Sequence, residues 1–561
     1  MPERQKPGIR PEIHPFPHQQ AAVERFEKNG GSLVMAHGVG TGKSAASLFM
    51  FDRMFQTGKA KRMLVITPAG LKTNYANAVK DFTTYGTQVV GAKGEQGTVY
   101  PGKLGAEPQV TVASYEMFAR DPEALVRESG ADMLILDEFH RIRNPEGVTY
   151  DAAVKARALV PFFVGMTGSP VNNDPKEIVP LINLAAGREI MKPSTFDRRH
   201  KVRIARQSGF FGGKRFVTSL KDLPGIQRDL GPHVDWVTTE DVGADTMPRK
   251  EVEEVHVTMS PEQRKIYDWA MGQIDPVTRW KIRNNLPVGQ KEANNVFSMI
   301  IKARQAANSS HLFRKDLSLE QDAATTPKVK RLLDDVERHL AERPDNQAVL
   351  YSNLIAGGVD VLSAGLKARG LDHALFVGKG RDVGDTKVTG PLRDQGVQEF
   401  KDKKKRVIVL SSAGAEGLDL KDATGFFSLD GHFNPERTRQ AEARVRRLKG
   451  QMYRPPEERK VQIKRYFSDY EPPSFMGRLF GKKAPTTTDT WIHNVALQKH
   501  RQNQMLQTAL KTPKPPASPT MPGPVSPVMA QPPKLRAPTR YLRRWKDVET
   551  GEWRYQYAPT V

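Results

Sequence analysis

The sequence of 561 residues contains no cysteine. This absence excludes disulfide frameworks, thiolate zinc sites, iron–sulfur clusters and cysteine nucleophiles, and it fits a reducing compartment. Long apolar runs are missing as well, since no segment approaches the roughly 18 consecutive apolar residues of a membrane helix. The first residues also lack the apolar core of a secretory signal. We therefore expect a soluble protein of the cytoplasm with no membrane partner.

Acidic residues are scarce relative to basic ones. The chain has 86 Lys and Arg against 63 Asp and Glu, which gives a formal net charge of +23. Residues 191–228 and 437–465 each carry a net charge of +8, and residues 534–561 carry +4. Basic segments of this kind favour a polyanion such as nucleic acid as the partner. They are equally compatible with solvated faces and tails, so charge alone does not decide between the two interpretations.

Short apolar segments recur at intervals that indicate buried parallel strands, with amphipathic stretches such as 45–56 and 70–82 between them. They form two series, and alternation of this kind predicts doubly wound α/β sheets. The predicted strands are 32–36, 63–67, 109–113, 132–136 and 162–166 in the first series, and 347–351, 374–377, 406–410 and 425–429 in the second.

The two series divide the chain into predicted domains. Each series indicates one α/β domain, and the stretch between them has helical periodicity and many charges. The predicted ranges are 1–187 (first α/β domain), 188–330 (largely helical, basic insertion and linker), 331–470 (second α/β domain), 471–512 (helical segment), 513–540 (Pro-rich linker) and 541–561 (β-hairpin).

The predictions for the C-terminal tail depend on proline and on aromatic residues. Nine prolines among residues 513–533 exclude a helix and indicate an extended linker, although a Pro-rich ligand for a protein partner is a second interpretation. Aromatic and basic residues alternate on both sides of Thr550-Gly551, which predicts a hairpin. This hairpin could stack on nucleic acid, or it could be a small self-packed β-motif or a tether to another domain. The tail that contains it could also dock a partner protein.

The segment AHGVGTGKS at residues 36–44 follows a predicted strand and precedes a predicted helix. Its glycines let backbone N–H groups turn toward phosphates, and the N-terminus of the helix adds positive potential. Lys43 would reach the β- and γ-phosphates of a nucleotide, and the Ser44 hydroxyl would help to hold Mg²⁺. The strict pattern has glycine where this chain has His37. The predicted nucleotide-binding residues of the loop are His37, Gly38, Val39, Gly40, Thr41, Gly42, Lys43 and Ser44.

A second motif, LILDEFH at residues 134–140, lies at the C-terminal end of a predicted strand, where α/β sheets place ligand-binding groups. Asp137 is suited to coordinate Mg²⁺, and Glu138 is suited to orient and deprotonate an attacking water. Adjacent acids after a strand are by themselves more often the solvated start of a helix. Because Gly42-Lys43-Ser44 precedes them by about 95 residues, they indicate a nucleoside-triphosphatase site that uses ATP and Mg²⁺.

With these motifs the sequence resembles the superfamily-two helicase-like ATPases, and specifically the Swi/Snf-type branch of double-stranded DNA translocases. PHQQAAVERF (17–26) resembles the family's adenine-contacting motif, with Gln19 at the glutamine position. TPAGLKTNY (67–75) and ASYEMF (113–118) resemble the segments that touch the DNA backbone. DEFHRIRN (137–144) resembles the extended acidic box, and MTGSPVNN (166–173) resembles the motif that couples hydrolysis to motion. The resemblance implies DNA-contacting or coupling roles for Thr67, Pro68, Ser114, Tyr115, His140, Thr167 and Gly168.

The second predicted domain carries the remaining motifs of the resemblance. VLYSN (349–353) and LSSAGAEGLDL (410–420) resemble the segments that link the nucleotide to the tracked strand. They imply coupling roles for Ser352, Ser411 and Ser412 and nucleotide contacts for Gly417 and Asp419. FNPERTRQAEARVRRLKGQ (433–451) matches the family's arginine motif and adds Gln440, Arg444 and Arg447 to the catalytic set of Lys43, Asp137 and Glu138. We predict that a helix presents both arginines, three residues apart, on one face toward the phosphoryl group.

The resemblance implies two tandem RecA-like domains that bind ATP–Mg²⁺ between them and double-stranded DNA across both, with RNA as a further possibility. Two segments of the insertion resemble the family's protrusions: STFDRRHKV (194–202), and the strand and Gln-Tyr stretch within 246–269. Strand-separating relatives generally lack these protrusions. We therefore expect an ATP-hydrolysing motor that translocates along duplex DNA without full strand separation. A strand-separating DNA or RNA helicase, and an ATP-switched nucleic-acid scaffold recruited through its tail, remain the alternatives.

The sequence departs from the family pattern at several positions. His37-Gly38 replaces an acidic pair, and Phe139 replaces the usual Ala or Gly of the acidic box. The motif at 410–420 is closer to bacterial and viral variants, and no segment resembles a bromodomain, a chromodomain or a histone-tail reader. We therefore expect a bacterial, phage or viral translocase, associated with the nucleoid or located in the host cytoplasm.

Overall fold

The structure is a computed structural model in which the chain divides into two compact units, residues 1–512 and 513–561. It describes residues 6–511 and the two strands 541–546 and 553–557. The gaps within 6–511 are 92–98, 100–103, 106–107, 172–173, 208–213, 243–246, 287, 315, 379, 412–417, 433–434 and 480–483. The predicted Pro-rich linker and the predicted site residues Ser412 and Gly417 lie outside the described residues.

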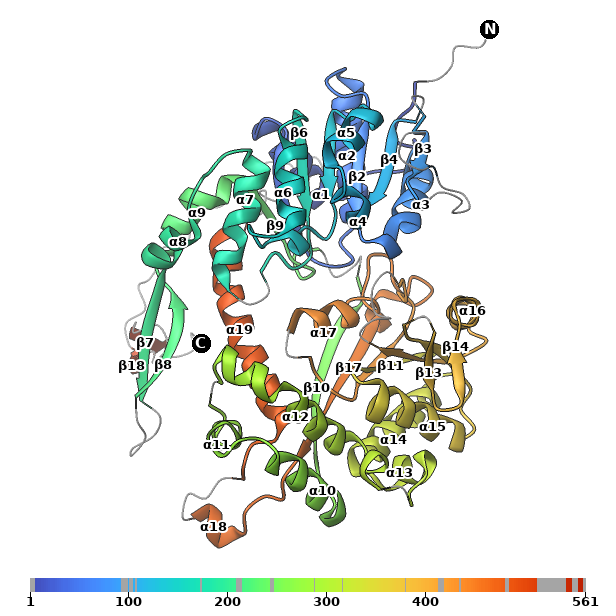
Figure 1. Ribbon diagram of the computed structural model, residues 1–561, viewed down its shortest axis with the longest axis vertical. Coiled ribbons are helices and arrows are strands. Elements are labelled where there is room, and N and C mark those ends of the chain that lie inside the picture. The colour runs from blue at the N-terminus through green and yellow to red at the C-terminus, as the bar shows by residue number, and fades with distance from the viewer. Residues whose placement is uncertain are drawn as a thin grey trace, which may run out of the picture. The chain divides into compact units, whose positions relative to one another are not determined.

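The first lobe of the larger unit is built on a parallel sheet of seven strands in the order β3-β4-β2-β5-β6-β1-β9 (Figure 1). All its neighbouring strands are parallel, so their C-terminal ends meet at one edge of the sheet. The strands are β1 (Ser32–His37), β2 (Met63–Thr67), β3 (Thr87–Val89), β4 (Val110–Ser114), β5 (Met133–Leu136), β6 (Phe162–Met166) and β9 (Val234–Val237).

Helices cover both faces of this sheet, because successive strand residues point to opposite faces. Leu33 and Met35 of β1 pack in the cluster that includes α1, α2 and α3, whereas Val34 and Ala36 pack in the cluster that includes α5, α6 and α7. The helices are α1 (Pro17–Lys28), α2 (Lys43–Gln56), α3 (Lys72–Phe82), α4 (Tyr115–Phe118), α5 (Pro122–Ser129), α6 (Val148–Arg157) and α7 (Ile178–Ala186).

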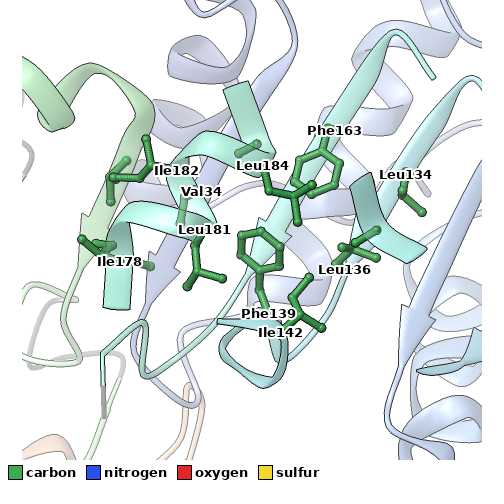
Figure 2. Close-up of a cluster of buried hydrophobic side chains, with 14 of the residues drawn as sticks. Val34, Leu134, Leu136, Phe139, Ile142, Phe163, Ile178, Leu181, Ile182 and Leu184 are labelled. Carbon is green, nitrogen blue, oxygen red and sulfur yellow. The ribbon is translucent and has the colours of Figure 1, made fainter. Parts of the chain in front are cut away.

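Phe139, unusual for its motif, lies in the second of these clusters. Figure 2 shows its ring among the labelled residues of β5, β6 and α7. The ring is fully buried and stands edge-on to Phe163, with the ring centroids 5.7 Å apart. A Cβ atom on Gly165 would lie 2.2 Å from the Phe139 ring, so the missing side chain at 165 makes the space that this phenylalanine fills.

The segment between the lobes contains both helices and strands. Its first part forms α8 and α9 around an antiparallel hairpin of β7 and β8. After β9, which completes the first sheet, the chain enters the second sheet through β10 and continues into four helices. The elements are α8 (Pro193–His200), β7 (Lys201–Gln207), β8 (Lys214–Leu220), α9 (Leu223–Leu230), β10 (Arg249–Thr258), α10 (Pro261–Gly272), α11 (Pro276–Arg283), α12 (Gln290–Asn308) and α13 (Leu319–Thr325).

The second lobe has a six-stranded parallel sheet in the order β10-β17-β16-β11-β15-β12. Its strands are β10, β11 (Ala348–Ser352), β12 (His373–Phe376), β15 (Val407–Ser411), β16 (Gly425–Ser428) and β17 (Lys460–Asp469). The further elements are α14 (Pro327–Glu342), α15 (Asp360–Ala368), β13 (Arg381–Val383), β14 (Thr386–Val388), α16 (Gly390–Lys401) and α17 (Pro435–Glu442). Two parallel α/β sheets in tandem confirm the predicted fold class.

Histidine 339 of α14 makes the second lobe sensitive to pH. Its Nε2 lies 2.9 Å from Thr424 Oγ1, and burial lowers its pKa from 6.5 to about 4. Between pH 6.5 and 4 the unfolded chain therefore binds a proton that the folded lobe does not. We expect the free energy of unfolding to fall by about 3 kcal/mol across this interval. The variant His339→Gln should lose this part of the pH dependence in urea unfolding, and identical pH profiles would contradict the expectation.

The helix α19 (Thr488–Leu510) joins the two lobes (Figure 1). Near its start, Trp491 and Ile492 belong to a cluster with α10 and α12. Asp489 forms a buried ion pair with Lys328 of α14, with 2.6 Å between Oδ2 and Nζ. Near its end, Leu506, Ala509 and Leu510 pack in the core of the first lobe.

The remaining described elements are small. A short helix, α18 (Phe475–Leu479), precedes α19. In the second unit, β18 (Tyr541–Lys546) and β19 (Trp553–Tyr557) pair as the predicted antiparallel hairpin. Among the helices of the described ranges, none combines the length and the apolar character that a membrane crossing requires.

Candidate nucleotide-binding and catalytic site

The Gly-rich loop lies between β1, which ends at His37, and α2, which begins at Lys43. Gly40 and Gly42 have φ angles of +82° and +81°, in the left-handed region that glycine adopts without strain. A Cβ atom on Gly42 would lie 2.5 Å from Gln19 Nε2. Gln19 holds the loop from outside, since its Nε2 donates to the Gly42 carbonyl (3.1 Å) and its Oε1 accepts from the Phe16 N–H (2.9 Å).

The side chain of Lys43 folds back onto the Gly-rich loop that precedes it. Its Nζ donates to the carbonyl oxygens of His37 at 3.1 Å and Gly38 at 3.3 Å. Burial lowers the pKa of the ammonium group, and the negative charges of Glu138 and Asp137 oppose this shift. The ammonium group therefore lies beside the acidic pair, at the place where the motif predicts the terminal phosphates.

The acidic pair follows β5 and is surrounded by groups that distinguish its two members. Asp137 accepts hydrogen bonds from Thr67 Oγ1 and from the Glu138 N–H, both at 3.0 Å, while burial and the charge of Glu138 raise its pKa to about 6. Burial also opposes ionisation of Glu138, but His140, Lys43 and Arg444 together hold its pKa below the ordinary value. Glu138 is therefore the more acidic member of the pair, and it stays ionised to lower pH than Asp137.

A path of polar contacts leads from Glu138 to the second lobe. Glu138 Oε2 lies 3.3 Å from Nδ1 of His140, and the same nitrogen lies 3.0 Å from Thr167 Oγ1. Thr167 Oγ1 accepts from the Ser169 N–H at 3.0 Å. Gln440 Nε2, on α17, completes the path by donating to Ser169 Oγ at 3.5 Å. Glu138 is thus connected to the other lobe through His140, Thr167 and Ser169.

The two predicted arginines come from the second lobe, but the prediction that a helix presents them is wrong. Helix α17 ends at Glu442, and both arginines lie in the turns that follow. The hydrogen bond that would continue the helix joins the Leu448 N–H to the Arg444 carbonyl. Instead, that carbonyl accepts from the Leu420 N–H (3.2 Å), and the Leu448 N–H donates to the Gly40 carbonyl of the first lobe (3.3 Å).

The arginine turn lies directly against the Gly-rich loop. A Cβ atom on Gly40 would lie 3.2 Å from Arg447 Cγ and 3.0 Å from the Arg446 carbonyl oxygen. Arg447 donates to the Leu418 carbonyl at 2.7 Å and lies 3.6 Å from Asp419, and its burial lowers the pKa of the guanidinium. Only a glycine at position 40 allows this approach of the two lobes.

These groups surround a cavity of about 720 Å³, which we call the nucleotide cavity. Its volume lies within the range of roughly 300–1,000 Å³ typical of small-molecule sites. Most of the predicted nucleotide-binding and catalytic residues line it, from both lobes. Those that line it are Gln19, Val39, Gly40, Gly42, Lys43, Ser44, Asp137, Glu138, Asp419, Arg444 and Arg447.

The donor set on the cavity wall fits a magnesium ion. Ser44 and Asp137 both line the cavity and offer oxygen ligands, which Mg²⁺ prefers. Within the part of the chain that the structure describes, no group of three or more His, Asp or Glu side chains could hold a metal ion. Mg²⁺ bound by one or two protein oxygens together with nucleotide phosphates does not need such a group.

Other predicted residues lie near the cavity without lining it. Thr41 is buried and bonded to the Gly38 carbonyl, and Gly38 and Gln440 line a second cavity. Tyr115 donates to the Asp137 carbonyl at 2.6 Å, while Ser114 accepts from the Met117 N–H and caps α4. Pro68 is buried at the end of β2, and Gly168 lies against Val39 of the loop.

In the second lobe, Ser352 and Ser411 lie opposite each other on the neighbouring strands β11 and β15. Both side chains are buried, and the Ser352 hydroxyl donates to Asp430. Asp430 also forms a buried ion pair with Arg304 of α12, with 3.1 Å between the charged groups. Ser352 is therefore part of the contact between the second sheet and the inserted helices, a connection to Arg304 and Asp430 that the motif did not reveal.

Sequence reasoning also missed Asp235, the partner of His37. The His37 ring is fully buried outside the nucleotide cavity, and its Nε2 lies 2.6 Å from Asp235 Oδ2 on β9. Arg25 of α1 lies 3.7 Å from the other carboxylate oxygen. The pairing of β1 with β9 positions these side chains, because His37 lies opposite Val237 and Asp235 lies opposite Met35 in the parallel ladder. His37 therefore anchors the base of the loop to the last strand of the first sheet.

We expect Asp235→Ala to lower the free energy of unfolding by about 2–4 kcal/mol, because the buried His37 loses its partner. The measurement is urea unfolding together with ATP affinity. Asp235→Asn keeps a polar partner and should lose less. Asp229→Ala, on α9, removes only ion pairs with the exposed Arg199 and Arg228 and should change the free energy by less than about 1 kcal/mol. Equal effects of Asp235→Ala and Asp229→Ala would refute the anchoring role.

Comparison with protein families agrees with this geometry. The model of the SNF2-related domain matches residues 18–312, and that of the helicase conserved C-terminal domain matches residues 331–449. The first match alone covers more than half of the 561 residues. The chain belongs to the SNF2-related family of helicase-like ATPases. It is an ATP-dependent, helicase-like enzyme, and the predicted family and enzyme class are confirmed.

Curated relatives are distant in sequence. An uncharacterised ATP-dependent helicase of Bacillus subtilis, YqhH, is 21% identical over 459 residues, which are 78% of this chain and 74% of that protein. The helicase MG018 of Mycoplasma genitalium is 23% identical over 76% of this chain and 38% of its own length. Chromodomain-helicase-DNA-binding protein 8 of Danio rerio is 23% identical over 75% of this chain. This chain spans only 17% of that protein's length.

Two solved structures are similar at low identity. The SWI2/SNF2 ATPase core of Sulfolobus solfataricus, in complex with double-stranded DNA, has 17% identity and a TM-score of 0.37, over 89% of this chain and 97% of that chain. The Hef helicase domain of Pyrococcus furiosus has 14% identity and a TM-score of 0.48, over 84% and 98%.

Proposed function

We propose that the protein is a motor that hydrolyses ATP to translocate along double-stranded DNA without fully separating the strands. The observation that supports this function best is the division of the nucleotide cavity between the lobes. The first lobe supplies Lys43, Asp137 and Glu138, and the second supplies Arg444 and Arg447. A site assembled from two lobes changes its geometry when the lobes move, which is what a motor requires.

The proposed hydrolysis uses side chains in positions that fit their chemistry. Glu138, held ionised by neighbouring positive charges, accepts the proton of the attacking water. Lys43 binds the terminal phosphates, and Arg444 and Arg447 stabilise charge on the transferring phosphoryl group. Ser44 and Asp137 would hold Mg²⁺, which supplies Lewis-acid stabilisation of the phosphate oxygens. Gln19 positions the loop and, by its place at the cavity wall, the base of the nucleotide.

The proposed coupling runs along the path from Glu138 through His140, Thr167 and Ser169 to Gln440. Its last contact, 3.5 Å between Gln440 and Ser169, is the longest and crosses between the lobes. A change at the phosphate end of the path would therefore strengthen or break this contact first. Opening and closing of the cavity would then advance the motor along one strand of the duplex, held mainly through its phosphates.

The proposal for DNA depends on the family, on the charge of the chain and on the inserted segment. Residues 191–228, with a net charge of +8, form α8, β7, β8 and α9, and binding through this segment would be salt-sensitive and tolerant of sequence.

The bacterial, phage or viral origin and a nucleic-acid or partner-binding role of the tail stay predictions. Deletion of residues 513–561 tests the role of the tail through DNA affinity.

Triplex displacement tests translocation on duplex DNA. We expect ATP-dependent release of a third strand from a long duplex, and no release by Lys43→Ala. A forked duplex distinguishes the first alternative, because a strand-separating helicase would unwind the fork and leave the triplex intact. An ATP-switched scaffold would do neither, and its ATP turnover would not depend on DNA length. Unwinding without triplex displacement would therefore refute the proposed mode of movement.

A further inference from the structure

A second cavity, of about 520 Å³, lies on the other side of the Gly-rich loop. It is lined by the loop residues Gly38 and Val39, by Gly168 and Ser169, and by segments of β9, α17 and α19. Val39 lines both cavities, so this residue forms part of the wall between them. All these segments belong to the larger compact unit.

The wall is thin at Gly168. A Cβ atom on this residue would lie 2.9 Å from Val39 Cγ2 and 3.5 Å from Lys43 Nζ. The backbone of Gly168 therefore separates the Lys43 ammonium group, which the loop directs toward the terminal phosphates, from the second cavity. Gln440, which also lines the second cavity, contacts Ser169 of the same wall at 3.5 Å.

The second cavity has an excess of positive charge. Its lining contains four cationic side chains, Lys250, Arg439, Arg446 and Lys511, and two carboxylates, Glu240 and Glu442. The carboxylates pair with two of the cations, since Glu442 lies 3.2 Å from Lys250 and Glu240 lies 3.3 Å from Arg446. Lys511 pairs with Asp241, which lies outside the lining, at 2.6 Å. This lining is suited to an anion, and a cavity partly shielded from water strengthens the attraction.

His500 of α19 responds to this potential. Arg439 NH1 lies 3.1 Å from His500 Nδ1. Burial, together with the charges of Arg439, Lys250 and Arg465, lowers the pKa of His500 to about 4. The imidazole is therefore neutral at pH 7, and His500 adds no charge of its own to the cavity.

We propose that the second cavity is a phosphate site, and that the inorganic phosphate released by ATP hydrolysis leaves the nucleotide cavity through it, past Val39 and Gly168. The inference rests on the proposed position of the nucleotide but not on translocation. Hydrolysis breaks the bond between the β–γ bridging oxygen and the γ-phosphorus, and water adds to that phosphorus. The products are ADP and inorganic phosphate, and the phosphate forms beside Lys43, next to the wall.

The test adds one negative charge to the second cavity. Gln507 of α19 lines it, and Gln507→Glu changes the charge with almost no change in shape. The matched control is Gln498→Glu, an exposed position on the same helix that lies outside this lining. Inorganic phosphate is titrated by calorimetry into protein whose nucleotide site is saturated with ADP and Mg²⁺. We expect Gln507→Glu to weaken phosphate binding about fivefold to tenfold, and Gln498→Glu to leave it within twofold.

A single-turnover experiment tests the route. Quenched flow measures cleavage of ATP, and a fluorescent phosphate sensor measures free phosphate. We expect Gln507→Glu to leave cleavage unchanged but to lengthen the delay before free phosphate appears severalfold. Equal phosphate affinity and equal delay in the three proteins would overturn the proposal.

Further outcomes separate this inference from a DNA-backbone site and from the proposed nucleotide site. A loss of DNA affinity in Gln507→Glu, with phosphate binding unchanged, would assign the cavity to a phosphate of the nucleic-acid backbone and would overturn it. A wild-type protein that binds ADP but not phosphate refutes the second site alone. A wild-type protein that does not bind ADP refutes the proposed nucleotide site. A protein that fails to displace a triplex can still be tested for phosphate binding by calorimetry, because the second site does not depend on translocation.

Discussion

Replacing Glu138 by glutamine is expected to lower kcat for ATP hydrolysis by about 10²–10⁴-fold and to leave ATP affinity within a few fold. The substitution replaces only the carboxylate by an amide, since glutamine has nearly the same shape as glutamate and adopts the same backbone conformation. This matters because Glu138 has a φ of +49°, an uncommon conformation that fixes the direction of its side chain. The loss of kcat would then report the missing base and not a displaced loop.

The measurement is steady-state hydrolysis with and without duplex DNA, together with equilibrium binding of a fluorescent ATP analogue. The matched control is Glu146→Gln, an exposed acid in the segment that follows the acidic pair. Its kcat should stay within twofold of the wild type. A kcat of Glu138→Gln within threefold of the wild type would show that another group accepts the proton.

The second large effect is expected at the arginine turn. We expect Arg444→Ala and Arg447→Ala each to lower kcat by about 10³-fold, because a guanidinium on the transferring phosphoryl group acts mainly in the transition state. Arg447→Lys keeps a positive charge but lacks the planar group, so its kcat should lie between those of the wild type and Arg447→Ala. Arg447 also holds the Leu418 carbonyl, and for this reason the alanine variant needs a check of its folding by urea unfolding.

Arg437→Ala is the control for this series. Arg437 is exposed on α17 and lines neither cavity. Its kcat without DNA should match the wild type. If the substitutions at 444 and 447 raise KM and leave kcat unchanged, the arginines bind ATP in the ground state only, and the proposed catalytic role fails.

Much of the first lobe could be predicted because its information is local in the sequence. The apolar segments that predicted strands 63–67 and 162–166 coincide with β2 and β6, and the Gly-rich loop joins β1 to α2 within nine residues. The acidic pair was found for the same reason. Two buried strands and their turns determine both motifs, so short-range patterns were sufficient.

The rest depends on contacts that are distant in sequence. Asp235 lies 198 residues from His37, and no local pattern connects them. The turns after α17 contact the other lobe, since the Leu448 N–H donates to the Gly40 carbonyl. Phe139 departs from the family motif, and the reason it fits is Gly165 on the neighbouring strand, which leaves space for its ring. The sequence analysis predicted a largely helical, basic insertion over 188–330, and this interpretation missed the hairpin of β7 and β8.

The docking of α19 has a mechanical consequence. An α-helix has a fixed rise of about 1.5 Å per residue, so the stretch between its two anchors, at Trp491 and Leu506, is a rod of about 22 Å. A rod of fixed length permits the lobes to rotate around its ends but resists their separation. A load on the motor would therefore be carried in part as compression or tension along α19. The apolar anchor at Leu506, Ala509 and Leu510 would add to the force needed to separate the lobes, beside the contact of Leu448 with Gly40.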